Sequence, residues 1–194
     1  MKLILAFLPW ILFAVLSHAH PKLALIVALA TTAIQVVAHV RRPKILEMVS
    51  LVFFSFSLLA LYVWHWERYS HHLGLFVHLL LASVAWGSLL AGIPFTLQYA
   101  REEVPSERWH EPLFIRTNRW ITIAWGTDFL LQAAVLEWQA ATGGAVPTVI
   151  SGTLTGCALL FTLWYPKRTR RLAQRAVDAK NAAARRAPDH LVPR

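Results

Sequence analysis

Apolar runs about as long as a membrane-crossing helix constrain this chain more than any other feature of its sequence. A helix needs about 20 residues to cross about 30 Å of hydrocarbon. Short stretches that carry most of the charge and several prolines separate the runs. The sequence therefore predicts an all-α polytopic membrane protein, with about six transmembrane helices in one bundle. The runs occupy residues 3–18, 22–40, 45–65, 73–98, 118–138 and 146–165.

The composition agrees with a membrane protein. Hydrophobic residues make up 57% of the chain, charged residues make up 15%, and the mean hydropathy is +0.48. In typical soluble domains about a quarter of the residues are charged. The net charge of +9 lies in loops and in one tail beside the apolar runs, which favours anionic lipid headgroups over nucleic acid as the counter-charge. We therefore expect membrane lipids as partners and no nucleic acid.

Lysine and arginine gather on one side of the predicted bundle. Positive residues near the ends of membrane helices mark the cytoplasmic side. The sequence follows this rule when both termini are cytoplasmic. The outer loops then keep only Lys22 and Arg68. The cytoplasmic side would hold Lys2, Arg41, Arg42, Lys44, Arg101, Arg108, Arg116, Arg119 and the tail from 167 to 186.

Composition divides the chain into three segments. Residues 1–166 form the predicted transmembrane domain, 167–190 a basic cytoplasmic tail, and 191–194 look like a thrombin-site remnant from a vector. Pro166 marks the first boundary, because a missing N–H costs little at the end of a span. The tail looks helical, and either lies along the membrane surface or extends into solvent. The first apolar run imitates a signal peptide, but the spans that follow favour a retained helix.

Polar groups inside hydrocarbon are costly and suggest function. Asp128 lies near the middle of the fifth run, where its carboxyl group could relay protons or simply hold two helices together. His78 in the fourth run would meet Asp128 or Gln132 if these two spans pack antiparallel. Pro94 should kink or loosen the fourth span, because it lacks a backbone donor. The candidate intramembrane functional residues are Asp128, His78, Pro94 and Gln132.

A second set of candidates lies on the predicted cytoplasmic face. The stretch from 101 to 119 mixes arginines with four glutamates, and the tail is basic. Positive side chains beside a membrane attract anionic headgroups. Nearby, Glu47 should form an ion pair with Lys44 or Arg119. The candidates for contact with headgroups or protein partners are Arg101, Arg108, Arg116, Arg119, Lys167, Arg168 and Arg171.

The residue inventory disfavours several kinds of chemistry. The single cysteine, Cys157, excludes an internal disulfide, a Cys-x-x-Cys redox pair and a thiolate zinc cluster. Histidines such as His71 and His72 could bind a transition ion weakly, but they lack a matching carboxylate and cysteine set. We find no Ser-His-Asp arrangement, phosphate-binding glycine loop or HExxH motif. We therefore expect no metal, no cofactor, no catalytic residue and no enzyme activity.

Short motifs follow one another in order through nearly the whole predicted transmembrane region. They are Met1-Lys2 and Phe7-Leu8-Pro9, Ala24-Leu25-Ile26-Val27-Ala28, Lys44-Ile45-Leu46-Glu47-Met48, Gly92-Ile93-Pro94, Asn118-Arg119-Trp120, and Ala124-Trp125. Their order resembles the intracellular septation protein A family of bacterial inner-membrane proteins. The resemblance implies a multi-pass inner-membrane protein that supports cell-envelope synthesis, septation and membrane integrity through contacts with division or elongation proteins. It implies no catalytic residues.

The residues alone leave two other functions open. A small transporter or channel could place Pro94, His78 and Asp128 along a pathway, because broken helices and buried ionisable groups are common at such sites. A membrane-embedded lipid enzyme would need at least two acid or base groups at one depth on facing helices. A non-enzymatic membrane factor would instead use its buried polar groups to fix the bundle and its cytoplasmic loop to meet partners.

Overall fold

The computed structural model describes residues 2–17, 19–142 and 146–186 of the chain. Helix accounts for 86% of the protein, and the described residues contain no strand, which confirms the predicted all-α class. The helices are α1 (Lys2–Ala6), α2 (Leu8–Ser17), α3 (Pro21–Ala38), α4 (Ile45–Tyr62), α5 (Glu67–His71), α6 (Leu73–Leu90), α7 (Thr96–Ala100), α8 (Pro112–Thr142) and α9 (Val146–Arg186). Two 3₁₀ turns, η1 (Arg101–Glu103) and η2 (Ser106–Arg108), precede α8.

Four of the described helices are long and apolar enough to cross a membrane, namely α3, α4, α6 and α9. They indicate a membrane protein. The first predicted run is divided between α1 and the 10-residue α2. The fifth is part of α8, whose 31 residues include four charged side chains, Arg116, Arg119, Asp128 and Glu137.

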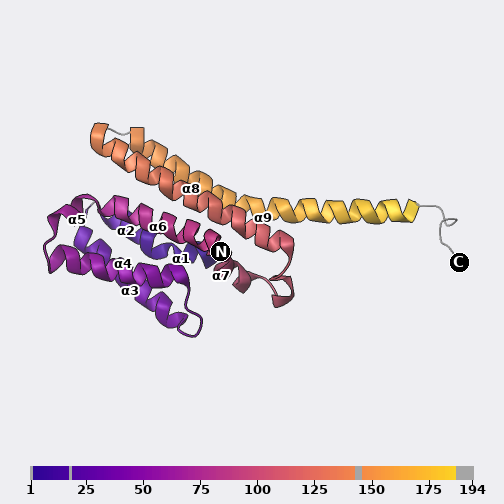
Figure 1. The fold of residues 1–194 in the computed structure, drawn as a ribbon, viewed down its shortest axis with the longest axis horizontal. Helices are drawn as coiled ribbons and strands as arrows, with labels where there is room; N and C mark the ends of the chain where they lie inside the picture. Colours follow the sequence, from indigo (N-terminus) through magenta and orange to yellow (C-terminus); the bar gives the residue numbers. More distant parts are fainter. Residues whose placement is uncertain (1, 18, 143–145, 187–194) are drawn as a thin grey trace.

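The helices pack side by side in an elongated bundle (Figure 1). Neighbouring pairs are α2 with α3, α3 with α4, α6 with α8, and α8 with α9. We call one end of this bundle the loop end: it carries α1, the turn at 39–44 and the segment 91–111. At this end α9 continues well past the other helices (Figure 1). The other end carries α5 and the turns beside it.

An aromatic core joins the first two helices to the rest of the bundle. Phe7, between α1 and α2, stacks on Trp125 of α8 with 4.8 Å between ring centroids. Trp10 donates a hydrogen bond of 2.8 Å from Nε1 to Oγ of Ser50 in α4. The break at Phe7 follows from Pro9, which cannot donate to the carbonyl of Leu5. Gln35 of α3 donates to that carbonyl instead, at 2.7 Å, so a neighbouring helix supplies the hydrogen bond that the break removes.

The prediction that Pro94 kinks the fourth span was wrong, because the helix ends before the proline. α6 stops at Leu90, and Gly92 follows with a φ of 75°. The N–H groups of Gly92 and Ile93 each donate to a carbonyl of the last turn at 3.0 Å. This left-handed glycine cap terminates helices efficiently, since only glycine adopts the conformation without steric cost. Pro94 therefore lies buried in the connection to α7, outside any helix.

The boundary predicted at Pro166 is not a helix boundary. α9 runs unbroken for 41 residues with Pro166 inside it. One turn later, Thr169 donates from Oγ1 to the carbonyls of Tyr165 and Pro166, at 3.1 and 3.0 Å. The tail is thus helical up to Arg186 and belongs to the same helix as the apolar part of α9 (Figure 1). Residues 187–194, which include the predicted vector remnant, lie outside the described residues.

Candidate functional site at the loop end of the bundle

The antiparallel packing on which a contact between His78 and Asp128 depended is present. On α6 and α8, Gly74 lies against Leu136 and Ala85 against Gly126. His78 nevertheless makes its hydrogen bond within its own helix, between Nδ1 and the carbonyl of Gly74 at 2.8 Å. The packing of the two helices therefore does not by itself join the predicted pair.

Gln132 ties α8 to α9. Its amide nitrogen donates to the carbonyl of Ser151 at 3.0 Å and to Oγ1 of Thr155 at 2.7 Å. Its amide oxygen accepts a hydrogen bond from Oγ of Ser151. With both ends of the amide engaged and only 3% of its surface exposed, Gln132 acts as a helix-to-helix tether, the role that polar residues often play inside membrane bundles.

Asp128 is the one buried acid among the described residues of α8. It is 5% exposed, and its Oδ1 has no hydrogen-bond partner among the described residues. An unsatisfied buried polar atom is costly. None of the four intramembrane candidates, Asp128, His78, Pro94 and Gln132, lines the cleft described below.

Charged side chains meet instead at the loop end, around Lys44. Lys44 is 4% exposed and Glu47 is 2% exposed. The Lys44 ammonium lies 2.9 Å from Oε1 of Glu102 and 3.9 Å from Oε1 of Glu47. The predicted ion pair between Glu47 and Lys44 is therefore confirmed. We call Lys2, His39, Lys44, Glu47, Tyr99 and Glu102 the Lys44 network.

Hydrogen bonds fix the tautomer of His39 in this network. The Lys44 ammonium, which can only donate, lies 3.2 Å from Nε2 of His39. Nε2 must then accept, which leaves the ring proton on Nδ1, 3.1 Å from the nearer oxygen of Glu47. His39 thus bridges the lysine and the glutamate, and connects the end of α3 to the start of α4.

The Lys44 network also holds α1 and α7 against α4. The Lys2 ammonium lies 3.1 Å from Oε2 of Glu102, and Lys44 lies over the ring of Tyr99 at 4.8 Å. Burial raises the pKa of Glu102, but hydrogen bonds and positive charges from Lys44 and Lys2 outweigh it and hold that pKa below its usual range. Burial raises the pKa of Tyr99, and the nearby Glu47 and Glu102 carboxylates add to this effect.

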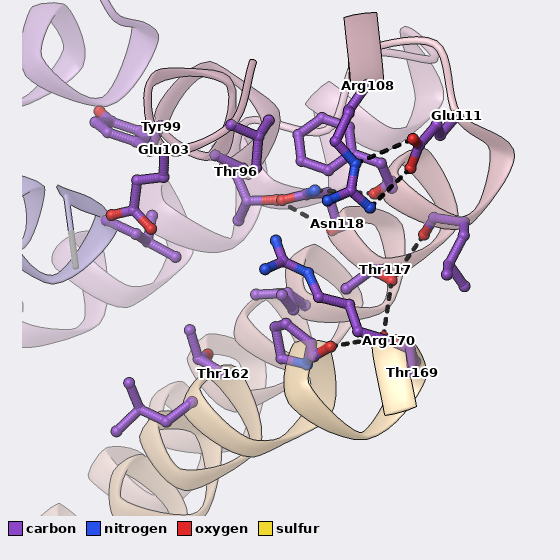
Figure 2. Close-up of a pocket in the computed structure, with 18 of the residues that line it drawn as sticks. Thr96, Tyr99, Glu103, Arg108, Glu111, Thr117, Asn118, Thr162, Thr169 and Arg170 are labelled. Atoms are coloured by element: carbon purple, nitrogen blue, oxygen red, sulfur yellow. Dashed lines mark hydrogen bonds and ion pairs between the residues drawn. The ribbon is translucent and has the colours of Figure 1, made fainter. Parts of the chain in front are cut away.

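A cleft of about 150 Å³ opens beside the network, between the start of α8, the middle of α9, α1 and the 96–111 segment. Figure 2 shows these parts converging around it. We call it the loop-end cleft. Its apolar lining comprises Leu3, Ile4, Ala100, Val104, Leu113, Phe114, Ile121, Leu163 and Pro166. Its polar lining comprises Thr96, Tyr99, Glu103, Arg108, Glu111, Thr117, Asn118, Thr162, Thr169 and Arg170.

Threonines position the helices that form the cleft. Thr96 of α7 donates to the carbonyl of Asn118 at 3.0 Å and lies 2.9 Å from Oγ1 of Thr122. Thr117 of α8 and Thr169 of α9 approach each other with 3.4 Å between their hydroxyl oxygens (Figure 2). These contacts set the rotation of α9, so that the residue after Thr169, Arg170, lies at the cleft.

The predicted headgroup residues fall into three groups. Arg108 lines the loop-end cleft and pairs with Glu111, with nitrogen–oxygen distances of 3.0 and 3.2 Å. Arg101 lies 5.5 Å from the ring of Trp109, and Arg168 lies 4.8 Å from the ring of Trp164. The other four residues are exposed outside the cleft: Arg116, Arg119, Lys167 and Arg171.

Sequence reasoning missed Arg170 and Lys44 as site residues. A weak signal for Arg170 was available, because it comes one turn after the proline that ends the apolar run. For Lys44 the spacing to Glu47 indicated one partner, but Glu102 is far away in the chain. Among the described residues, no group of three His, Cys, Asp or Glu side chains could hold a metal ion.

Comparison with known proteins adds no relative to this description. No family model, curated protein or solved structure matches the chain. The resemblance to the septation protein A family therefore stays a prediction, and function has to be sought in the geometry of the loop end.

Proposed function

We propose that this chain is a non-enzymatic protein of the bacterial inner membrane, similar to the septation protein A family. It supports cell-envelope synthesis, septation and membrane integrity through protein or lipid contacts at the loop end. One observation carries the proposal: α9 leaves the bundle there as a helix with exposed Arg168, Arg171 and Arg175. From 167 to 186 this extension is about 30 Å long, enough to meet a partner beyond the headgroups.

The proposed topology has six crossings with both termini in the cytoplasm. Four crossings are the apolar helices. The fifth is formed by α1 together with α2, and the sixth by α8. In α8 the charged residues other than Asp128 lie toward the two ends, with Arg116 and Arg119 at the loop end and Glu137 at the other. The loop end also carries Lys2 and Lys44, so the positive-inside rule favours its cytoplasmic placement.

Cysteine labelling in intact cells tests this topology. In a Cys157→Ala background, single cysteines replace Arg68, Ser106 or Gln174 in the full-length chain. We expect an impermeant maleimide to label position 68 in intact cells, and positions 106 and 174 only after permeabilisation. Labelling of position 106 or 174 in intact cells would overturn the cytoplasmic placement of the loop end.

Removing positive charges from the tail tests its proposed role in septation. Replacing Arg168, Arg171 and Arg175 together with glutamine should leave membrane insertion intact and impair septation, because the exposed cations that meet the partner are lost. The measurement is the cell length restored in bacteria that lack their own copy of the gene. Arg41→Gln with Arg42→Gln, at the same end but away from the tail, is the matched control. Equal restoration by both variants and the wild type contradicts a role for the tail.

A second candidate function, a small transporter, is favoured by one observation, the unpartnered Oδ1 of Asp128. Asp128→Asn keeps the shape of the side chain and removes its charge. Under the non-enzymatic proposal we expect this variant to fold and to restore cell length like the wild type. A variant that keeps its melting temperature in detergent but loses function would favour transport through Asp128.

A further inference from the structure

The loop-end cleft combines an apolar wall with a charged opening. Leu113, Phe114, Ile121 and Leu163 come from the two long helices, and Leu3 and Ile4 come from α1. Trp164 and Tyr165 follow Leu163 in α9, as is usual where a membrane helix reaches the headgroup region. The cleft is therefore placed where an amphiphile would have its chain in hydrocarbon and its head near water.

The charges that line the cleft are not equally engaged. Arg108 binds both carboxylate oxygens of Glu111, and Glu103 accepts a hydrogen bond of 2.7 Å from the backbone N–H of Lys2. Arg170 makes no hydrogen bond or ion pair with the described residues. The pKa of the Glu111 carboxyl group is lowered, mainly by the hydrogen bonds from Arg108. The positive charges of Arg108 and Arg170 lower it further, so Arg170 acts on Glu111 through its charge alone. Arg170 is thus the available cation of the cleft.

We propose that the loop-end cleft binds one anionic phospholipid of the surrounding leaflet. One acyl chain lies along the apolar wall, and the lipid phosphate accepts hydrogen bonds from the guanidinium group of Arg170. A planar guanidinium suits this role, since two of its N–H groups can bind a phosphate at once. The pairing of Glu111 with Arg108 limits the repulsion that a free carboxylate would exert on the headgroup. The inference rests on the proposed function only for placing the loop end at the membrane boundary.

Thermal unfolding of the purified full-length chain in dodecyl maltoside tests the site. The additives are phosphatidylglycerol, phosphatidylcholine with the same chains, and inorganic phosphate. We expect phosphatidylglycerol to raise the melting temperature by about 5 °C more than phosphatidylcholine, as for a ligand well above its Kd. Arg170→Gln should abolish this difference, while Arg42→Gln, exposed at the same end of the bundle but outside the cleft, should keep it.

A second pair of variants tests the chain-binding wall without changing charge. Leu163→Trp fills the cleft and should also abolish the extra stabilisation by phosphatidylglycerol. Leu160→Trp, which is 68% exposed and outside the cleft, should preserve it. Retention of the lipid effect in Arg170→Gln, or its equal loss in Arg42→Gln, overturns the site.

The results with inorganic phosphate and with the two lipids also test whether the ligand is an anionic phospholipid. Full stabilisation by inorganic phosphate would overturn the phospholipid assignment, because an anion without a chain would suffice. Equal stabilisation by the two lipids would overturn the role of the headgroup charge. These results are distinguishable from failure of the proposed function, since the melting experiment needs neither a division partner nor a cell, whereas topology and cell length are measured separately.

Discussion

Replacing Lys44 with methionine is expected to lower the free energy of unfolding by about 3–5 kcal/mol, the range seen when one partner of a buried ion pair is removed. The physical reason is the group left behind. Glu47, 2% exposed, loses the lysine ammonium and keeps His39 as its neighbour, and Glu102 keeps Lys2. The measurement is equilibrium unfolding of the full-length protein in mixed micelles, with helix content followed by circular dichroism.

A double variant separates the ion pair from packing. Lys44→Met combined with Glu47→Leu removes both charges, and apolar replacement of a whole buried pair is often close to neutral. The double variant should therefore recover more than half of the stability lost in Lys44→Met. A loss below about 1 kcal/mol in the single variant would instead place the pair among solvent-exposed ion pairs, contrary to its burial.

The second large effect is expected at Gly126, where α6 and α8 approach closely. A Cβ atom at this position would lie 2.8 Å from Nε1 of Trp86 and 3.2 Å from Cβ of Ala85. Gly126→Leu should therefore force the two helices apart and cost about 1–3 kcal/mol, the usual range for overpacking. Equilibrium unfolding in mixed micelles measures this loss as well.

The chain supplies a matched control for this change. Gly152 also lies in a long helix, α9, but a Cβ atom there meets nothing within 4 Å. Gly152→Leu should change the free energy of unfolding by about 0.5 kcal/mol or less, as for other substitutions without close neighbours. If the two leucine variants are equally stable, the close approach of α6 and α8 is not what holds this part of the bundle.

The helices themselves were largely predictable, because length and hydropathy are local properties. Four of the predicted runs, 22–40, 45–65, 73–98 and 146–165, correspond to helices that are apolar enough to cross a membrane. The error came at 73–98, where the run continues past the end of the helix. Gly92 caps α6 before Pro94 is reached, and hydropathy alone does not distinguish a capped helix from a kinked one.

The candidate site was only partly predictable. Glu47 and Lys44 were paired correctly, since residues three apart on a helix face the same side. Three further members of the Lys44 network, Lys2, Tyr99 and Glu102, come from distant segments. Their meeting depends on how α1 and α7 pack against α4, and no spacing in the sequence encodes that.

The sequence by itself determined the all-α class, the apolar helices and the end of the bundle where positive charge gathers, because each depends on residue type and spacing along one segment. The tertiary structure decided which polar groups meet. Gln132 faces α9, His78 bonds within α6, and Arg170 reaches the loop-end cleft. The reason is physical: the rotation of a helix about its axis is fixed by the side chains of its neighbours, such as the contact between Thr117 and Thr169, and not by its own hydropathy.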